Sequence, residues 1–392
     1  MNEVVAVSAV RTAIGSFGGG LKDYPAPDLL AVLIKEALRR ANVPGELVND
    51  VIVGQCMQRC DENTTGRVAA LKAGLPISVP GVTIQRNCSS AMQALVYGAQ
   101  QIMLGEMDVV VTGGVEVLSR VPYTIEGARW GQRLQHGKMA DGVWDGLTDS
   151  FTGLIMGLTA ENLAEKYNIS RLEQDEVALR SHNNAEKAIK TGKFKEEIVP
   201  IEIPQKKGAP KIFDTDEHVR YGLTMEQLAA LKPTFKKDGT VTAGNASGIN
   251  DGSAVIVLMS AAKAKSLGIQ PIARLRGHGV AGVEPELMGY GPVPATKQAL
   301  ERTGLTLEDM ELIEVNEAFA AQYIACEKLM GLKRELVNVN GSGVGLGHPV
   351  GCTGVRIIVS LLHEMRRRGN SLGLATLCVG GGMGQTTIWE ML

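Results

Sequence analysis

The chain has 392 residues, of which 44% are hydrophobic and 4% aromatic, and its formal net charge is −2. This length suggests two or three domain-sized units with enough apolar material for large cores. The near-neutral charge argues against a nucleic-acid partner held by bulk electrostatics, and the shortage of aromatic side chains argues against a base-stacking platform. Six scattered cysteines in a chain of this length do not suggest a disulfide framework.

No segment has the composition of an export signal or of a membrane span. The first apolar run, residues 4–10, is short, follows an acidic residue and alternates as a strand does. No apolar stretch reaches the roughly 20 residues that a membrane-spanning helix needs. We therefore expect no membrane partner, and a chain that acts in the cytoplasm.

The first part of the chain alternates strand-like and helix-like segments. Short apolar runs predict strands, and apolar residues spaced three and four apart predict helices. Such alternation is typical of an α/β fold, in which helices pack on a sheet. In chain order, the predicted elements are strands at 4–10, 50–54, 82–85 and 108–114, and helices at 29–41 and from about 89 to 104.

The middle of the chain has a different character. Residues 196–222, EEIVPIEIPQKKGAPKIFDTDEHVRYG, are rich in charge and proline, which indicates an insertion that covers a site. The stretch INDGSAVIVLMS at 249–260 returns to strand character, and we expect it to rejoin the first sheet. The predicted units are a first half at 1–117 completed by 249–269, an inserted loop domain at 118–248, and a second half at 270–392.

The last third repeats the plan of the first. EALRRANVPGELVNDVIVG (36–54) and QALERTGLTLEDMELIEVN (298–316) share a helix end, a turn with an acidic residue and an apolar strand. The next stretches, 87–114 and 347–382, both run loop, helix, strand and a glycine pair or triplet. We interpret this pattern as an internal duplication. A duplicated unit places equivalent loops side by side, where they can form a shared site.

Cys88 is the first candidate for chemistry. In TIQRNCSSAM (83–92) it stands just before the predicted helix, where backbone amides and the helix dipole favour a thiolate. Ser89 and Ser90 are suitable first-turn residues. Two interpretations remain open from this stretch alone, a nucleophile and a buried packing cysteine.

Three more loops follow apolar elements. His348, in NGSGVGLGHPVGCTG (340–354), lies in the loop that the duplication makes equivalent to that of Cys88, so it is a candidate base. Cys378 ends a strand and enters a glycine run whose amides could form an oxyanion hole. Asn316 ends another strand, where it could hold a water or a substrate oxygen, or could merely cap the next helix.

Several other motifs do not complete a site. GHGVAG (277–282) matches the dinucleotide fingerprint, but prolines follow where a helix is required. Cys56 and Cys60 are spaced like half of a zinc site that nothing completes, so we expect no metal. The basic loop GARWGQRLQHGK (127–138) favours an exposed or inter-subunit loop over nucleic-acid binding.

Taken together, the four loops resemble those of the thiolase family, and the resemblance covers essentially the whole chain. The family's Cys-x-Ser, Asn-Glu-Ala-Phe, Gly-His-Pro and Cys-x-Gly motifs stand here in the same order. They are Cys88-Ser89-Ser90, Asn316-Glu317-Ala318-Phe319, Gly347-His348-Pro349 and Cys378-Val379-Gly380. The resemblance implies a five-layered α-β-α-β-α fold, built from two duplicated halves with an inserted loop domain.

The resemblance also implies a reaction, the reversible Claisen condensation of acyl-CoA. Cys88 would carry the acyl group, His348 would take its proton, and Cys378 would be the second acid/base. Asn316, through a water, and His348 would form one oxyanion hole, and the amides of Cys88 and Gly380 would form the other. Coenzyme A would act as substrate, with no tightly bound cofactor and no metal.

Six residues are expected along the coenzyme A path, with Arg220 at the nucleotide end. They are Leu147, Met156, Arg220, Ala243, Ser247 and Phe319. The family resemblance further implies a homotetramer, a dimer of dimers, with Arg129–Lys138 as a candidate contact and a dimer as the alternative.

The sequence departs from the short-chain members of the family near the acyl group. Leu154-Ile155-Met156-Gly157 stands where these members usually have Tyr-His-Met-Gly, and Gly343 and Gly345 replace two alanines. We expect these glycines to widen the space near the acyl group.

We predict an acetyl-CoA C-acetyltransferase, with a longer-chain 3-ketoacyl-CoA thiolase of β-oxidation as the alternative. A ketoacyl synthase is disfavoured by Cys378. A non-catalytic coenzyme A-binding relative is disfavoured because all four loops are intact.

Overall fold

The computed structural model describes all 392 residues. The first half of the fold is a mixed sheet in which β3 pairs in parallel with β4 and β5, and β10 pairs antiparallel with β5 and β1. The short β2 (Gly15–Ser16) adds to β10. In spatial order the main strands are β1 (Val4–Arg11), β10 (Asn250–Ser260), β5 (Val109–Val117), β3 (Asp50–Gly54) and β4 (Gly81–Ile84).

The second half repeats this pairing with different residues. Here β12 pairs in parallel with β13, and β14 pairs antiparallel with β13 and β11. Residue Val337 makes an isolated parallel bridge to Ile313, in the place that β4 occupies beside β3. The internal duplication is therefore confirmed at the level of topology. The strands are β11 (Ala273–Gly282), β14 (Met383–Met391), β13 (Leu372–Val379) and β12 (Leu312–Val315).

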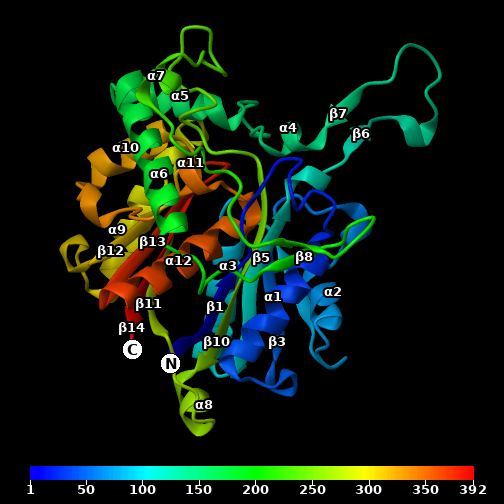
Figure 1. Cartoon of the computed structure of the whole chain (residues 1–392), viewed down its shortest axis with the longest axis vertical. Helices are drawn as coiled ribbons and strands as arrows, with labels where there is room; N and C mark the ends of the chain where they lie inside the picture. The colour runs from blue at the N-terminus through cyan, green and yellow to red at the C-terminus, as the bar shows by residue number, and fades with distance from the viewer.

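Helices fill the space between and outside the two halves of the sheet (Figure 1). The strands of the two halves pair with each other at only two positions, Val5 with Arg274 and Ala6 with Ala273. The layers run α1 and α2, first sheet, α3 and α12, second sheet, α9 and α10, as the five-layered prediction requires. The helices are α1 (Ala26–Ala41), α2 (Thr65–Lys72), α3 (Ser90–Leu104), α9 (Pro292–Thr303), α10 (Ala320–Met330) and α12 (Thr353–Arg368).

Each sheet is buried on both faces, which explains its nearly continuous apolar strands. Alternate residues of one strand enter different cores. In β13, Ala375 and Leu377 join the central core with α3 and α12, whereas Leu374 and Cys378 join the outer core with α10. The central helices are buried over most of their length, and each ends at a glycine with a positive φ, Gly105 for α3 and Gly369 for α12.

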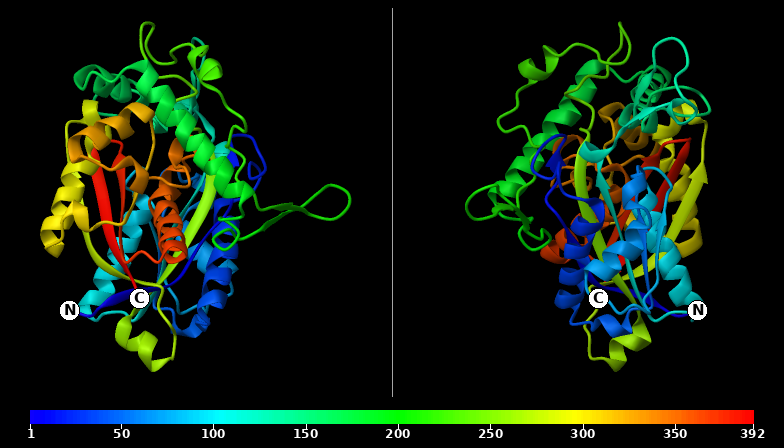
Figure 2. Two further views of the ribbon diagram at one scale, coloured as in Figure 1. Left: turned by 60° about the vertical axis from the view of Figure 1, so that its left-hand side comes forward. Right: turned by 90° about the vertical axis from the view of Figure 1, so that its right-hand side faces the viewer.

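The segment between β5 and β10 lies over one end of the layered body, and two hairpins project from it (Figures 1 and 2). The boundaries at 117/118, 248/249 and 269/270 remain a prediction. Two short helices lie outside this segment, α8 (Ala261–Ser266) after β10 and α11 (Gly343–Leu346) before α12. The elements of the segment are β6 (Tyr123–Ile125), β7 (Met139–Asp141), α4 (Gly142–Gly146), α5 (Met156–Lys166), α6 (Arg171–Lys190), β8 (Ile201–Ile203), β9 (Lys211–Phe213) and α7 (Met225–Ala229).

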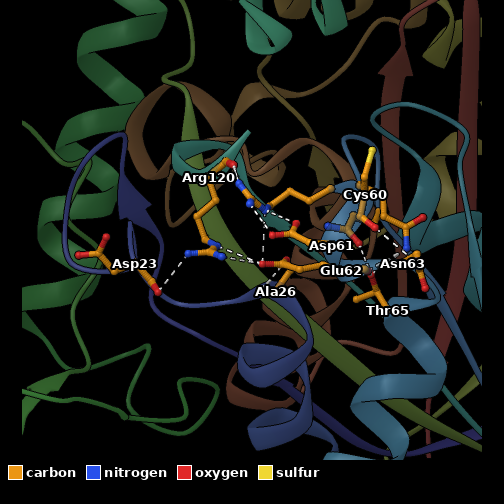
Figure 3. Close-up of polar contacts among 11 residues, drawn as sticks. Asp23, Ala26, Cys60, Asp61, Glu62, Asn63, Thr65 and Arg120 are labelled. Carbon is orange, nitrogen blue, oxygen red and sulfur yellow. Dashed lines mark hydrogen bonds and ion pairs between the residues drawn. The ribbon is translucent and has the colours of Figure 1, made fainter. Parts of the chain in front are cut away.

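An ion-pair network lies at the base of the β6–β7 hairpin (Figure 3). Glu62 accepts hydrogen bonds from Arg120 Nη2 at 2.8 Å and from the backbone N–H of Ala26 at 3.1 Å. Arg59 donates to the carbonyl of Arg120. Since Glu62 is almost fully buried, this network ties the start of the hairpin to the first half of the fold.

The structure also tests two alternatives from the sequence. Residues 277–282, GHGVAG, lie inside β11 and not at a strand-to-helix turn, so the dinucleotide motif is excluded. None of the helices combines the length and the apolar character needed to cross a bilayer.

Candidate active site

Cys88 lies in a tight loop between β4 and α3. The preceding Asn87 has φ 42°, a left-handed conformation that asparagine tolerates better than most residues. Ser90 closes the turn by donating to the carbonyl of Asn87 at 2.7 Å. The side chain of Asn87 donates to the carbonyl of Gly380 at 2.8 Å, so the Cys88 loop is tied to the glycine run after β13.

His348 occupies the equivalent place before α12. Its backbone N–H donates to Asn250 Oδ1 at 2.9 Å, and its Nδ1 lies 2.6 Å from Thr353 Oγ1. The ring is buried and lines the same cavity as Cys88. The duplication therefore brings together the two loops that the sequence identified as equivalent.

Cys378 and Gly380 come from the end of β13. Cys378 is fully buried, and the Cys88 sulfur is near enough to contribute to a rise in its pKa. The backbone N–H groups of Gly380 and of Cys88 itself are close enough to the Cys88 sulfur to lower the pKa of its thiol in part. Two amides thus lie beside the Cys88 sulfur, where they could donate to the oxygen of a thioester carbonyl that reacts there.

Asn316 directly follows β12, and its side chain is fully buried. Neither polar atom of its amide has a hydrogen-bond partner within the protein. An unsatisfied buried amide is costly, so this group is available for a water or a substrate oxygen. The capping alternative is wrong, because α10 begins after Phe319 and no side chain caps it.

Burial controls the charge state of these groups. It raises the pKa of the Cys88 thiol to about 11, and the amides of Gly380 and Cys88 offset only part of this rise. It also lowers the pKa of His348 to about 3. The expectation that the helix end would favour a Cys88 thiolate is therefore wrong. Cys88 and His348 are both neutral at pH 7, because the cost of desolvation outweighs the effect of the helix end.

This charge state predicts the spectrum of the resting protein. Because the thiol pKa is raised, Cys88 remains protonated at pH 8 and ionises only as the pH approaches about 11. At pH 8 the wild-type protein and Cys88→Ser should therefore have the same ultraviolet absorbance in the thiolate band. A full thiolate band at pH 7 would show instead a preformed thiolate–imidazolium pair.

A mostly apolar cavity of about 230 Å³ opens at Cys88 and His348. Of the six residues expected along the coenzyme A path, Leu147, Met156, Ser247 and Phe319 line this cavity. Arg220 and Ala243 lie outside it. They are joined by a hydrogen bond of 2.9 Å from Arg220 Nη2 to the Ala243 carbonyl, and Arg220 lines a separate shallow pocket.

Three further apolar residues of the cavity wall were not predicted from the sequence. Phe235, Ile249 and Met288 line it although they come from three distant segments. Apolar residues of this kind have no signal in a single sequence, because the same composition serves a core. A second, more polar cavity of about 260 Å³ shares Cys88 and Met156 with the first.

Glu116 is a second group that the sequence did not reveal. It is fully buried in β5 and accepts hydrogen bonds from the backbone N–H groups of Cys56, Met57 and Gly351, at 2.8 to 3.0 Å. Burial raises the pKa of Glu116 to about 7, although these three hydrogen bonds act to lower it. Glu116 thereby joins the loop after β3 to the loop that carries His348.

The expectation that Gly343 and Gly345 widen the acyl space is wrong. A Cβ at Gly343 would lie 2.7 Å from Asn316 Oδ1, and one at Gly345 would lie 2.6 Å from the carbonyl oxygen of Ser181. Both glycines are packed tightly against neighbouring backbone. They permit close approach of the α11 turn to Asn316 and create no additional space.

Cys56 and Cys60 do not face a common point. Cys56 contacts Asn87 Oδ1 at 3.6 Å and lines the polar cavity, whereas Cys60 is exposed at the surface. No group of three or more His, Cys, Asp or Glu side chains is placed to hold a metal ion.

Comparison with known proteins identifies the family. Residues 4–262 match the thiolase N-terminal domain and residues 269–391 match the thiolase C-terminal domain. The chain belongs to the thiolase family. This thiolase is 52% identical to an acetyl-CoA acetyltransferase of Cupriavidus necator over 98% of each chain.

Solved structures are similar over the full length. The Bacillus anthracis acetyl-CoA acetyltransferase superposes with a TM-score of 0.99 at 56% identity, covering 100% of this chain and 99% of that one. Human mitochondrial 3-ketoacyl-CoA thiolase in complex with CoA superposes with a TM-score of 0.96 at 43% identity, covering 100% of this chain and 98% of that one. The thiolase fold is thus confirmed.

Proposed function

We propose that this thiolase is an acetyl-CoA C-acetyltransferase that joins acetyl-CoA to an acyl-CoA and, in reverse, cleaves 3-ketoacyl-CoA. The observation that supports this proposal is the convergence of four loops on Cys88. Cys88 and His348 line a mostly apolar cavity, and the Cys378 thiol and the Gly380 amide are close to the Cys88 sulfur. This set supplies a nucleophile, two proton carriers and an oxyanion hole.

In the first half-reaction, Cys88 attacks the thioester carbonyl as His348 accepts its proton. The amides of Cys88 and Gly380 stabilise the oxyanion of the tetrahedral intermediate. The coenzyme A thiolate then departs and takes the proton from His348. The product is an acyl-Cys88 thioester, and release of coenzyme A before the second substrate binds gives ping-pong kinetics.

In the second half-reaction, Cys378 passes its own proton to Nε2 of His348 and, as the thiolate, removes a proton from the methyl group of acetyl-CoA. The enolate oxygen is stabilised by the protonated His348 and by a water held on Asn316, whose amide has no partner within the protein. The α-carbon attacks the acyl carbonyl, the C–C bond forms, and the Cys88 thiolate departs and takes the proton from His348. Thiolysis follows the same steps in reverse.

Coenzyme A would enter along the apolar cavity, with its pantetheine arm beside Ser247 and Phe319. Leu147 and Met156, which line the same cavity, would also contact the pantetheine arm. The nucleotide would lie near Arg220, which is partly exposed, with Ala243 held beside it. A planar guanidinium is well suited to pair with phosphate there.

The acyl chain length remains the point that separates two candidate functions. Ile155 stands where short-chain members usually carry histidine, and it lines the cavity with Val143 and Val350. This apolar wall favours the alternative of a longer-chain 3-ketoacyl-CoA thiolase. Measurement of kcat/KM for thiolysis against 3-ketoacyl-CoA chain length decides between them, since each extra buried methylene contributes roughly 0.8 kcal/mol.

A matched pair of variants tests the role of the wall. If acyl groups lie along Ile155, Ile155→Phe should reduce kcat/KM for long substrates about tenfold or more and affect acetoacetyl-CoA little. Ile77→Phe is the control, because Ile77 is exposed on the surface away from the cavity. An equal loss at every chain length would remove Ile155 from the acyl path.

We further propose a homotetramer in the cytoplasm. β4 is the outer strand of its sheet, with Val82 exposed, and such unpaired edges are usually covered. The β6–β7 hairpin projects from the body with Tyr123, Trp130 and Leu134 exposed (Figure 1). An apolar surface of this kind is typical of a subunit contact.

Sedimentation of the full chain tests this assembly. Replacement of residues 127–137 by a short Gly-Ser turn should convert a tetramer into an active dimer, because the hairpin tip would join one dimer to the other. A tetramer that persists without the hairpin tip would place the contact elsewhere. Cell fractionation tests the location.

A further inference from the structure

The contact between His348 and Thr353 is a buried part of the site that has no role in the reaction steps described above. Thr353 is the first residue of α12 and is fully buried. Its Oγ1 lies 2.6 Å from His348 Nδ1 and 2.9 Å from the carbonyl oxygen of Pro349. A hydroxyl has one proton and can donate it to only one of these two groups.

The carbonyl of Pro349 decides where that proton lies. A carbonyl oxygen only accepts, so a separation of 2.9 Å between it and Oγ1 is favourable only when the hydroxyl proton lies between them. The carbonyl cannot move away, because the backbone N–H groups of Cys352 and Thr353 also donate to it, at 2.9 and 3.0 Å. The lone pair of Oγ1 is therefore directed at His348 and requires a proton on Nδ1.

We infer that Thr353 is a positioning residue that holds His348 as the Nδ1–H tautomer and leaves Nε2 unprotonated as the base toward Cys88. The inference rests on the proposed function, since it says which nitrogen takes the Cys88 proton. Thr353 itself touches no reacting atom. It acts as the third member of a Cys88–His348–Thr353 arrangement, in the way that a hydrogen-bonded second group fixes the tautomer of a catalytic histidine.

The surroundings of His348 offer no other group for this task. Its backbone is held by Asn250, so the ring position does not depend on Thr353 alone. The charged group that acts on the ring is Arg356 of α12, and the Cys88 thiol shares its cavity. Removal of the Thr353 hydroxyl should therefore change the tautomer while leaving the loop in place.

The test is single-turnover acetylation of Cys88, followed by rapid quench and mass spectrometry. Thr353→Val should acetylate about 10- to 100-fold more slowly, with half-saturation by acetyl-CoA changed little. Thr353→Ser should restore most of the rate. The control is Thr112→Val, which removes an equally buried hydroxyl that donates to the Ile256 carbonyl at 2.9 Å, on β5 and outside the cavity.

Two outcomes would overturn the inference. One is acetylation of Thr353→Val at the wild-type rate, and the other is a folded Thr353→Ser as slow as Thr353→Val. If Thr353→Val fails to fold, nitrogen NMR of the His348 ring in the unchanged protein decides, because a proton on Nε2 at neutral pH contradicts the assignment. A wild-type protein that does not acetylate at all would instead refute the proposed function and leave the tautomer measurement standing.

Discussion

Cys88→Ser should abolish thiolysis and condensation, lowering kcat by at least about 10⁴-fold. The serine keeps the size and position of the side chain, but its hydroxyl is a much weaker nucleophile than a thiol. After incubation with acetyl-CoA, mass spectrometry should find an acetyl adduct on Cys88 of the wild-type protein and none on the variant. An unmodified Cys88 in folded wild-type protein would exclude catalysis through an acyl-Cys88 intermediate.

The control for this result is another buried cysteine. Cys326 is fully buried in α10, where its sulfur contacts the carbonyl of Gly289 at 3.3 Å. It does not line the cavity at Cys88. Cys326→Ala should acetylate at the wild-type rate, so a loss shared by both variants would indicate a general effect of removing a core thiol.

Cys378→Ala should separate the two half-reactions. Acetylation of Cys88 should continue, because His348 and the amides of Gly380 and Cys88 are unchanged. Condensation and exchange of the acetyl-CoA methyl protons with deuterated water should fall about 10²- to 10⁴-fold, the usual contribution of a positioned acid/base. The measurement is adduct formation and proton exchange on the same sample.

The two readouts of Cys378→Ala have distinct meanings. Wild-type proton exchange in this variant would refute the role of Cys378 as the base. Loss of acetylation as well would show that Cys378 supports Cys88 and does not act separately. That second result is physically possible because the two sulfurs are close enough for Cys88 to contribute to the raised pKa of Cys378.

Most of the fold could be predicted from the sequence because its signals are local. The run VVAVSAV became β1, and the spacing after Cys88 became α3, within a residue or two of the expected ends. The duplication was visible because both copies keep the order of helix, turn and strand. It predicted that the Cys88 and His348 loops would meet, and both now line one cavity.

The contacts that adjust these residues could not be predicted in this way. Glu116 bonds to backbone about 60 and 235 positions away, and nothing in GGVEV marks it as different from an ordinary strand residue. Thr353 is close to His348 in sequence, but its two bonds depend on how α12 begins. Gly343 and Gly345 were misjudged because the absence of a side chain suggests space, whereas the neighbouring backbone fills it.

The sequence by itself determined the family, the α/β class and which side chains can carry acyl chemistry, since these depend on residue type, order and spacing along the chain. Only the tertiary structure decided the charge state of those side chains. The helix end near Cys88 predicted a thiolate, but enclosure by two halves of the protein raises the pKa of the thiol and lowers that of His348. Desolvation is a property of everything packed around a group, and most of what surrounds Cys88 is distant from it in sequence.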